Sequence, residues 1–261
     1  MLIDAHTHLS SIIRKGEKTT VEEIMARAAE VGVGYVMTVS DDMAESEEAV
    51  KHAHLSPNIY CALAFHPTNA HELDETCRKR MAELVQDPKC LAIGETGLDE
   101  YWIGKMESCP ELDVQEEAFR WHIGLARDVD KPVMIHSRDA DENLLRVLKD
   151  EELPREVMLH CFSSPMETAK QALDLGCVLS FCGNTTFKRN DYLREIAAYA
   201  PLDRILVETD APFMSPEPLR GRRNEPSHIV HTYQCIADAR GIPRAALEEA
   251  VEQNFHRMFR V

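Results

Sequence analysis

The chain has 261 residues, of which 44% are hydrophobic and 28% are charged, a composition that suits a globular protein with a substantial core. Its formal net charge of −16 argues against a protein that coats nucleic acid through long-range attraction, although local contacts to a few phosphates stay open. The sequence has no run of about 18 apolar residues and does not start like a secretory signal peptide, so we expect no membrane span and a cytoplasmic location.

Short apolar segments alternate with amphipathic segments along the chain. The apolar segments predict strands at Leu2–Ala5, Gly34–Val39, Tyr60–Phe65, Leu91–Gly94, Val133–Ile135, Val157–Leu159, Val178–Phe181 and Ile205–Val207. The amphipathic segments predict helices that begin after the N-cap Thr20 and then at Ser46–His54, Asp74–Gln86, Val114–Asp128, Asp141–Lys149, Met166–Leu175, Asp191–Tyr199, Ser227–Arg240 and Ala245–Phe259.

About eight strand–helix units in series indicate either a closed barrel of parallel strands or a doubly wound open sheet. The position of polar residues favours the barrel, because in a barrel the carboxyl ends of all strands meet at one mouth. Polar residues follow nearly every predicted strand: His6 and His8, Asp41, His66, Glu95, His136, His160, Asn184 and Asp210. We therefore predict an α/β protein, a (β/α)₈ TIM-like barrel with a closing C-terminal helix, as a single domain over residues 1–261.

Eight cysteines are present, but no two of them form a CxxC pair, which argues against a cysteine zinc site. Several of them, including Cys61, Cys90, Cys177 and Cys182, lie in apolar strand-like segments. Buried reduced thiols behave as small hydrophobic side chains. We expect the cysteines to be structural thiols.

The strongest chemical signal is a set of histidines and carboxylates at strand ends. His6 and His8 are two positions apart in an extended segment, so their side chains point the same way and can grip one cation. Burying any one polar group without a partner costs several kcal/mol, whereas a bound cation would compensate for a whole cluster. A mixed imidazole and carboxylate set suits Zn²⁺, Mn²⁺ or a similar divalent ion. We predict six metal ligands: His6, His8, Glu95, His136, His160 and Asp210.

Ordered sequence blocks give these residues a family context. AHTHL, IGETGLD, IHSRDA, LHCFSS, TFK and VETDAPFMSPEP…RGRRNEP together resemble the TatD-type metal-dependent deoxyribonuclease family, from His6 to Pro226. The resemblance implies a TIM-like barrel, two divalent metals (Mg, Mn or Zn) and nuclease activity on DNA. It also implies that His6, His8, Glu95 and Asp210 hold one metal, and that Glu95 bridges to a second metal completed by His136 and His160.

The expected reaction is hydrolysis of a phosphodiester bond by a metal-activated water. We predict Asp210 and Glu95 as the catalytic residues, with Asp210 as the general base. His66, Arg138, Arg222 and Arg223 follow strands and are predicted to bind substrate phosphates, since a guanidinium pairs with phosphate through two parallel hydrogen bonds. The expected partner is DNA, single-stranded or at its ends.

Two other functions remain open at the level of sequence. A barrel with this ligand set could instead be an amide or ester hydrolase, including an aminoacyl-tRNA deacylase, because function lies in the loops rather than in the fold. The chain could also be a non-catalytic metal-binding scaffold. A scaffold has no need for six costly polar groups at one mouth, which disfavours that alternative.

Overall fold

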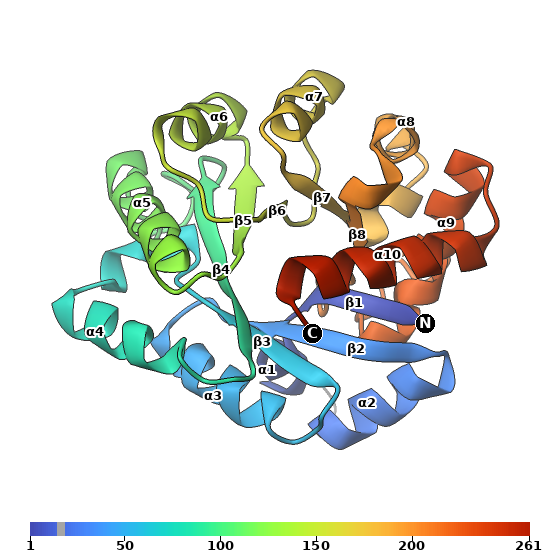
Figure 1. Cartoon of the computed structure of the whole chain (residues 1–261), viewed down its shortest axis with the longest axis horizontal. Helices are drawn as coiled ribbons and strands as arrows, with labels where there is room; N and C mark the ends of the chain where they lie inside the picture. Colours follow the sequence, from blue (N-terminus) through green and yellow to red (C-terminus); the bar gives the residue numbers. More distant parts are fainter. Residues whose placement is uncertain (15–18) are drawn as a thin grey trace.

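The computed structural model describes residues 1–14 and 19–261, and within these ranges eight parallel strands follow one another in the order β1 to β8. The strands are β1 (Leu2–Thr7), β2 (Val33–Val39), β3 (Ile59–Leu63), β4 (Cys90–Asp99), β5 (Val133–Arg138), β6 (Val157–Leu159), β7 (Val178–Phe181) and β8 (Ile205–Val207). Helices surround them on the outside (Figure 1). This is the predicted barrel of alternating strands and helices.

The helices that follow the strands lie close to the predicted ranges. They are α1 (Leu9–Arg14), α2 (Val21–Glu30), α3 (Met43–Ala53), α4 (Glu75–Leu84), α5 (Leu112–Asp128), α6 (Asp141–Asp150), α7 (Met166–Asp174), α8 (Asp191–Tyr199), α9 (Ile229–Arg240) and α10 (Arg244–Phe259). Short 3₁₀ turns lie at η1 (Pro67–Glu72), η2 (Gly183–Thr186), η3 (Leu202–Arg204) and η4 (Pro226–His228). None of the described helices is both long and apolar enough to cross a membrane.

The local sequence explains where individual helices begin and which of their faces is buried. Thr20 caps α2 by accepting from the Glu23 amide, while the Glu23 carboxylate accepts from the Thr20 amide, which satisfies two amides at the helix start. In α6 the apolar residues Leu144, Leu145 and Leu148 are all buried and recur at helical spacing. The helices thus bury one apolar face each against strands that are themselves apolar on both sides.

The two ends of the sheet meet at the mouth of the barrel. The Asp210 amide donates to the His6 carbonyl at 3.0 Å, and the His8 amide donates to the Ala211 carbonyl at 2.7 Å. Just below, the buried Asp4 carboxylate accepts from the amide and hydroxyl of Thr209. These bonds join the segment after β8 to β1, so the first and last predicted ligands lie side by side.

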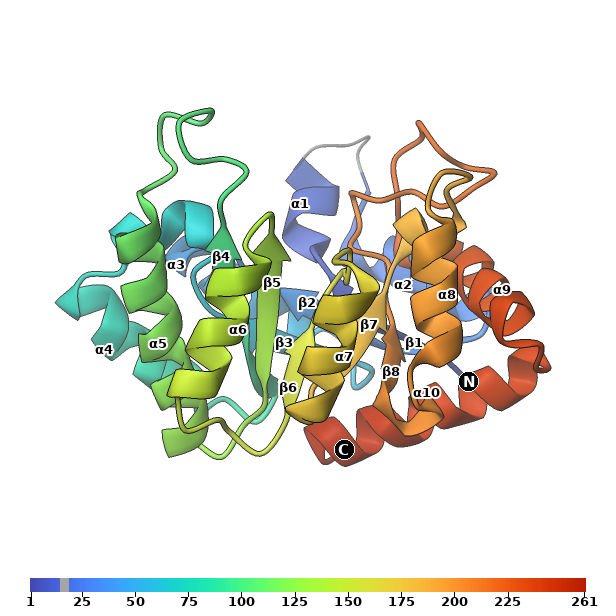
Figure 2. The same cartoon turned by 90° about the horizontal axis from the view of Figure 1, so that it is seen from above.

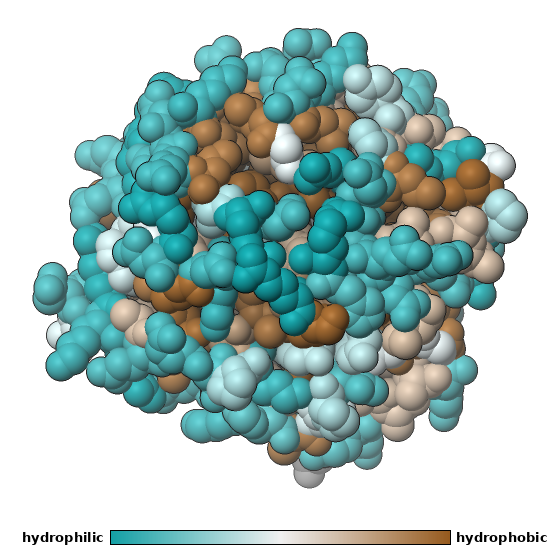
Figure 3. Space-filling view, viewed as in Figure 1, coloured by the Kyte–Doolittle hydropathy of each residue, from teal (hydrophilic) through white to brown (hydrophobic). Residues whose placement is uncertain are grey.

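The two faces of the barrel differ. In Figure 2 the strands point toward the face where the long loops after β4 and β8 rise, while α10 runs across the opposite face beside both chain termini. The α10 face is covered mainly by hydrophilic side chains, with smaller apolar areas between them (Figure 3). The closing C-terminal helix is therefore present, and the mouth lies at the carboxyl ends of the strands.

Three predicted strands extend further at their carboxyl ends in the structure. β1 extends to Thr7, β4 to Asp99 and β5 to Arg138. β4 and β5 are longer because they continue to pair beyond the apolar segments, with Gly97 opposite His136. A Cβ on Gly97, whose φ is +145°, would lie 2.0 Å from the His136 carbonyl oxygen. The close approach of the two strands at the mouth therefore requires glycine there.

Candidate metal centre

Four of the predicted ligands surround one point at the mouth. The Nε2 atoms of His6 and His8 lie 3.1 Å apart. Glu95 Oε1 lies 3.7 Å from His6 Nε2 and 3.3 Å from His8 Nε2. Asp210 Oδ1 lies 3.7 Å and 3.5 Å from the same two nitrogens. All four side chains are buried or nearly so, which makes them a compact donor set.

The other oxygen of Glu95 faces a second donor set. Glu95 Oε2 lies 2.6 Å from His160 Nε2 and 3.4 Å from His136 Nδ1, and these two nitrogens are 3.3 Å apart. The ring of His160 also stacks on the ring of His6, with centroids 4.0 Å apart. Glu95 therefore stands between the two sets, with one oxygen turned to each.

The residues fit divalent cations. Ligands bonded to one such ion at about 2.0–2.2 Å lie roughly 3.0–3.5 Å from one another, and the separations above span 2.6–3.7 Å. Imidazole nitrogens and carboxylate oxygens are donors that divalent transition metals accept. Glu95 Oε2 is buried and makes no hydrogen bond. Because buried polar atoms are normally paired, an unpaired carboxylate oxygen here fits a position that binds a cation.

Two further carboxylates orient the second set of histidines. Asp99 Oδ2 lies 3.0 Å from His136 Nε2, and Glu208 Oε1 lies 3.2 Å from His160 Nδ1. With a cation bound, the nitrogen beside the carboxylate in each ring would carry the proton, and the opposite nitrogen would turn its lone pair to the centre. Asp99 and Glu208 are not among the six predicted ligands. The signal was present in the sequence, since Asp99 is four residues after Glu95 and Glu208 is two residues before Asp210. Such even spacings point side chains to the same side of an extended segment.

Electrostatics keep the central carboxylate ionised. Burial by itself raises the pKa of Glu95, but His160 and His6 outweigh it and hold this pKa well below the ordinary value. Burial lowers the pKa of His6 well below its usual range, with His160 adding to the effect. Burial also acts to lower the pKa of His160, yet Glu95 and Glu208 raise it well above the ordinary value. The Glu95 carboxylate and the His160 imidazole thus stabilise each other's charged forms, and a cation that binds here would displace the His160 proton.

Removing the Asp99 carboxylate tests whether it orients His136. We expect Asp99→Ala to weaken binding of one divalent ion by about 10–100-fold, because the ring loses the partner that fixes its tautomer and orientation. Titration of the metal-stripped protein with Mn²⁺ in a calorimeter measures the change. Asp203→Ala, in η3 on the far side of the barrel, is the control. Equal affinities in all three proteins would contradict the assigned role of Asp99.

His66 lies at the rim beside the second donor set. Its Nδ1 accepts from the Thr68 amide at 3.2 Å, so the proton sits on Nε2. The His66 ring packs edge-on against His136, with centroids 4.4 Å apart. Burial, followed by the neighbouring His136, lowers the pKa of His66 to about 3. His66 is therefore a neutral hydrogen-bond donor next to the centre.

The three predicted arginines take different positions. Arg138 ends β5 at the rim, and its guanidinium lies 3.8 Å from the Tyr101 ring centre and 5.4 Å from that of Trp102, a cation–π arrangement. Arg222 is exposed in the loop after β8. Arg223 instead donates to the backbone carbonyls of Ser11 and Ile12 in α1. That contact gives Arg223 a structural partner, and its role in phosphate binding stays a prediction.

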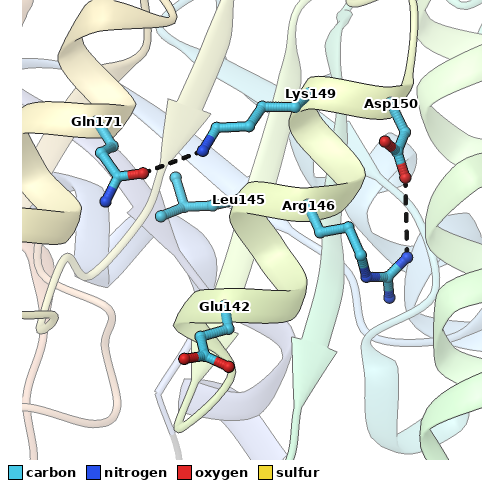
Figure 4. A pocket seen from close by; sticks show the side chains of 6 residues that line it. All are labelled: Glu142, Leu145, Arg146, Lys149, Asp150 and Gln171. Carbon is cyan, nitrogen blue, oxygen red and sulfur yellow. Dashed lines mark hydrogen bonds and ion pairs between the residues drawn. The ribbon is translucent and has the colours of Figure 1, made fainter.

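Two cavities lie on the outer ring of the barrel. One of about 380 Å³ lies between α6 and α7, where Lys149 donates to Gln171 at 3.0 Å and Arg146 pairs with Asp150 (Figure 4). A second of about 540 Å³ lies against α8 and α9 and includes Arg194 and Cys235. Neither is lined by a predicted ligand.

Known proteins resemble this chain over most of its length. The chain matches the TatD related DNase family over residues 3–260. It is 42% identical to the uncharacterized metal-dependent hydrolase TatD of Mycobacterium tuberculosis over 237 residues, which cover 91% of this chain and 89% of that protein. It is 32% identical to the 3′-5′ ssDNA/RNA exonuclease TatD of Escherichia fergusonii, covering 91% and 92%.

A solved structure agrees. The crystal structure of YJJV, a TatD homolog from Escherichia coli, superposes with a TM-score of 0.90 at 27% identity, covering 100% of this chain and 98% of that one. The match extends through all the strands that carry the candidate ligands. The chain belongs to the TatD-related DNase family and is a metal-dependent hydrolase.

Proposed function

We propose that this protein is a deoxyribonuclease that hydrolyses phosphodiester bonds in single-stranded DNA or at DNA ends. The observation that carries the proposal is the position of Glu95, whose two oxygens face two separate donor sets. A paired centre of this kind suits phosphoryl transfer, where two cations stabilise the attacking and leaving oxygens. The name of the Escherichia fergusonii relative, an exonuclease of single-stranded DNA and RNA, supports the same substrate class, and we place the activity in the cytoplasm.

Six side chains would hold two divalent cations, which we propose to be Mg²⁺, Mn²⁺ or Zn²⁺. His6, His8, Glu95 and Asp210 would hold one, and Glu95, His136 and His160 the other. When bound, such cations polarise a phosphoryl oxygen and make water acidic enough to attack near neutral pH. Asp99 and Glu208 keep His136 and His160 in the tautomer that this binding requires.

Asp210 is the proposed general base. Its carboxylate lies at the mouth, 3.5 Å from His8 Nε2, and its backbone is fixed by the bond to the His6 carbonyl. A positioned carboxylate of this kind can accept a proton from the attacking water. Because the same oxygen faces the first donor set, Asp210 combines ligand and base roles.

Three residues at the rim are proposed to contact the substrate. His66 presents the neutral Nε2–H derived above and can donate to a phosphoryl or leaving oxygen. Arg138, held over Tyr101, and the exposed Arg222 offer guanidinium groups that match phosphate geometry. A small local group of donors reconciles a net charge of −16 with an anionic substrate.

Substitution of Arg222 tests the phosphate contact. We expect Arg222→Ala to weaken binding of single-stranded DNA and to reduce the slope of log K against log salt by about 1, as for the loss of one phosphate contact. Fluorescence anisotropy at several salt concentrations, with a metal that does not support cleavage, measures both. Arg244→Ala, on α10 at the opposite face, is the control. An unchanged slope would count against Arg222.

The function itself is tested by digestion of end-labelled DNA. Metal-reconstituted protein should degrade single-stranded DNA with Mg²⁺ or Mn²⁺, and a chelator should stop the reaction. The same protein is offered amide and ester substrates and aminoacyl-tRNA. Hydrolysis of one of these without DNA cleavage would favour the alternative hydrolase, and absence of any metal binding would favour a non-catalytic scaffold.

A further inference from the structure

Two thiols lie directly behind the metal centre. Cys161 follows His160 after β6, and Cys182 follows Phe181 after β7, so both stand at the carboxyl ends of neighbouring strands. The Phe162 amide donates to the Ser180 carbonyl at 2.9 Å, which continues the pairing of these strands past their ends. The two Sγ atoms are 2.9 Å apart. A disulfide needs about 2.0 Å, so small movements of the two side chains would join them.

Cys161 and Cys182 lie at the mouth of the barrel, unlike another pair of neighbouring cysteines. Cys61 and Cys90 are register partners on β3 and β4, but they are 0% and 1% exposed and lie at the closed end of the barrel. Cys161 is partly exposed, on the side from which solutes enter. We therefore expect an oxidant from solvent to meet Cys161 before Cys182, which is fully buried.

Hydrogen bonds couple the thiols to the metal ligands. The Cys161 amide donates to Glu208 Oε1 at 2.8 Å, and the same oxygen accepts from His160 Nδ1 at 3.2 Å. Cys161 also holds a positive φ of 43°, a costly backbone conformation that persists only where neighbouring contacts hold it. On the other side, Cys182 contacts Asn184 Oδ1 at 3.2 Å. A covalent bond that pulls Cys161 toward Cys182 would therefore strain the Cys161 amide and its contact with Glu208, the carboxylate that orients His160.

We propose that Cys161 and Cys182 form a reversible disulfide under hydrogen peroxide, and that this bond weakens metal binding by His136 and His160. The Cys161 sulfur attacks one peroxide oxygen, the O–O bond breaks, and water and a sulfenic acid form. The Cys182 sulfur then attacks the Cys161 sulfur, the S–O bond breaks, and a second water leaves. Two electrons pass from the thiols to peroxide, and a dithiol reductant reverses the change.

The proposal is independent of the substrate. It rests on the metal centre, because its second part concerns the affinity of His160 for a cation.

The oxidation of the two thiols will be slow. The contact with Cys182, together with burial, raises the pKa of the Cys161 thiol well above its usual value, burial raises that of Cys182, and protonated thiols react slowly. Exposure to peroxide must therefore be long.

The experiment uses metal-stripped, reduced protein that is exposed to hydrogen peroxide and then cleared of it. Alkylation of the remaining thiols and peptide mass mapping without reductant identify the linked residues. Calorimetric titration with Mn²⁺ then compares reduced, oxidised and re-reduced protein. We expect a Cys161–Cys182 cross-link, about tenfold weaker binding of one of the two ions, as when an orienting partner is disturbed, and recovery after dithiothreitol.

Two variants provide the controls. Cys182→Ser should lose the cross-link and keep its Mn²⁺ affinity after peroxide, whereas Cys235→Ser, at another partly exposed thiol, should respond like the wild type. Mapping of the wild type needs no variant and decides the first part if Cys182→Ser does not fold. Absence of the cross-link would overturn the proposal, as would a cross-link with an unchanged titration. Reduced protein that binds no Mn²⁺ would overturn the metal centre and the coupling together, while the mapping still reports on the thiols.

Discussion

Replacing Glu95 with glutamine will lower the rate of DNA hydrolysis by about 10³-fold or more, since metal charge stabilisation is worth several kcal/mol and each 1.36 kcal/mol is tenfold in rate. The reason is the shared position of this side chain. Its Oε1 lies 3.3 Å from His8 Nε2 and its Oε2 lies 2.6 Å from His160 Nε2. A glutamine supplies one oxygen and an NH₂ group, which cannot accept a cation. One donor set therefore loses its carboxylate, and the centre loses a negative charge.

Metal stoichiometry distinguishes this explanation from misfolding. Elemental analysis and Mn²⁺ titration of Glu95→Gln should show the loss or marked weakening of at least one ion, with an unchanged circular dichroism spectrum. Glu107→Gln changes an exposed carboxylate in the loop after β4 and should leave both metal content and rate as in the wild type. If Glu95→Gln retains two ions and a rate within a few-fold of the wild type, the bridging role is wrong.

The sequence was sufficient to predict the barrel and to place the six polar residues at one mouth. The order of apolar and amphipathic segments predicted the strands in their correct sequence, and the rule that parallel strands meet at their carboxyl ends predicted a common site. The i, i+2 spacing of His6 and His8 predicted a shared direction, and their Nε2 atoms are 3.1 Å apart. These features follow from local periodicity, which a sequence shows directly. The assignment of residues 1–261 to one domain stays a prediction.

Other features depend on contacts between distant segments. The helix α1 has six residues, too few for a strong periodic signal, and tertiary partners hold it: Arg14 pairs with Glu45 at 2.8 Å, and Arg223 binds the Ser11 carbonyl. Because α1 was not predicted, the structural partner of Arg223 could not be foreseen. Similarly, the extension of β4 to Asp99 arises from its pairing with β5. The spacing of Asp99 from Glu95 suggested an orienting role, but only the three-dimensional structure shows that its partner is His136.

The Asp210→Asn variant separates the chemical step from metal binding. Asp210 has a φ of 53°, a left-handed conformation that asparagine also tolerates, so the backbone at the mouth should be retained. Asparagine keeps a carbonyl oxygen at the position that faces His6 and His8, but it cannot accept a proton from water. We therefore expect kcat to fall by about 10²–10⁴-fold, while KM changes only a few-fold.

The contrast between kcat and metal affinity decides the role of Asp210. Loss of a general base lowers kcat at saturating metal, because binding of the substrate does not depend on proton transfer. Loss of a ligand alone would lower metal affinity, and excess Mn²⁺ would restore the rate. Asp139→Asn, at an exposed aspartate that also has a positive φ and follows β5, controls for the amide substitution. Full recovery of Asp210→Asn by excess metal would show that Asp210 is a ligand only, and another group would then have to accept the proton from water.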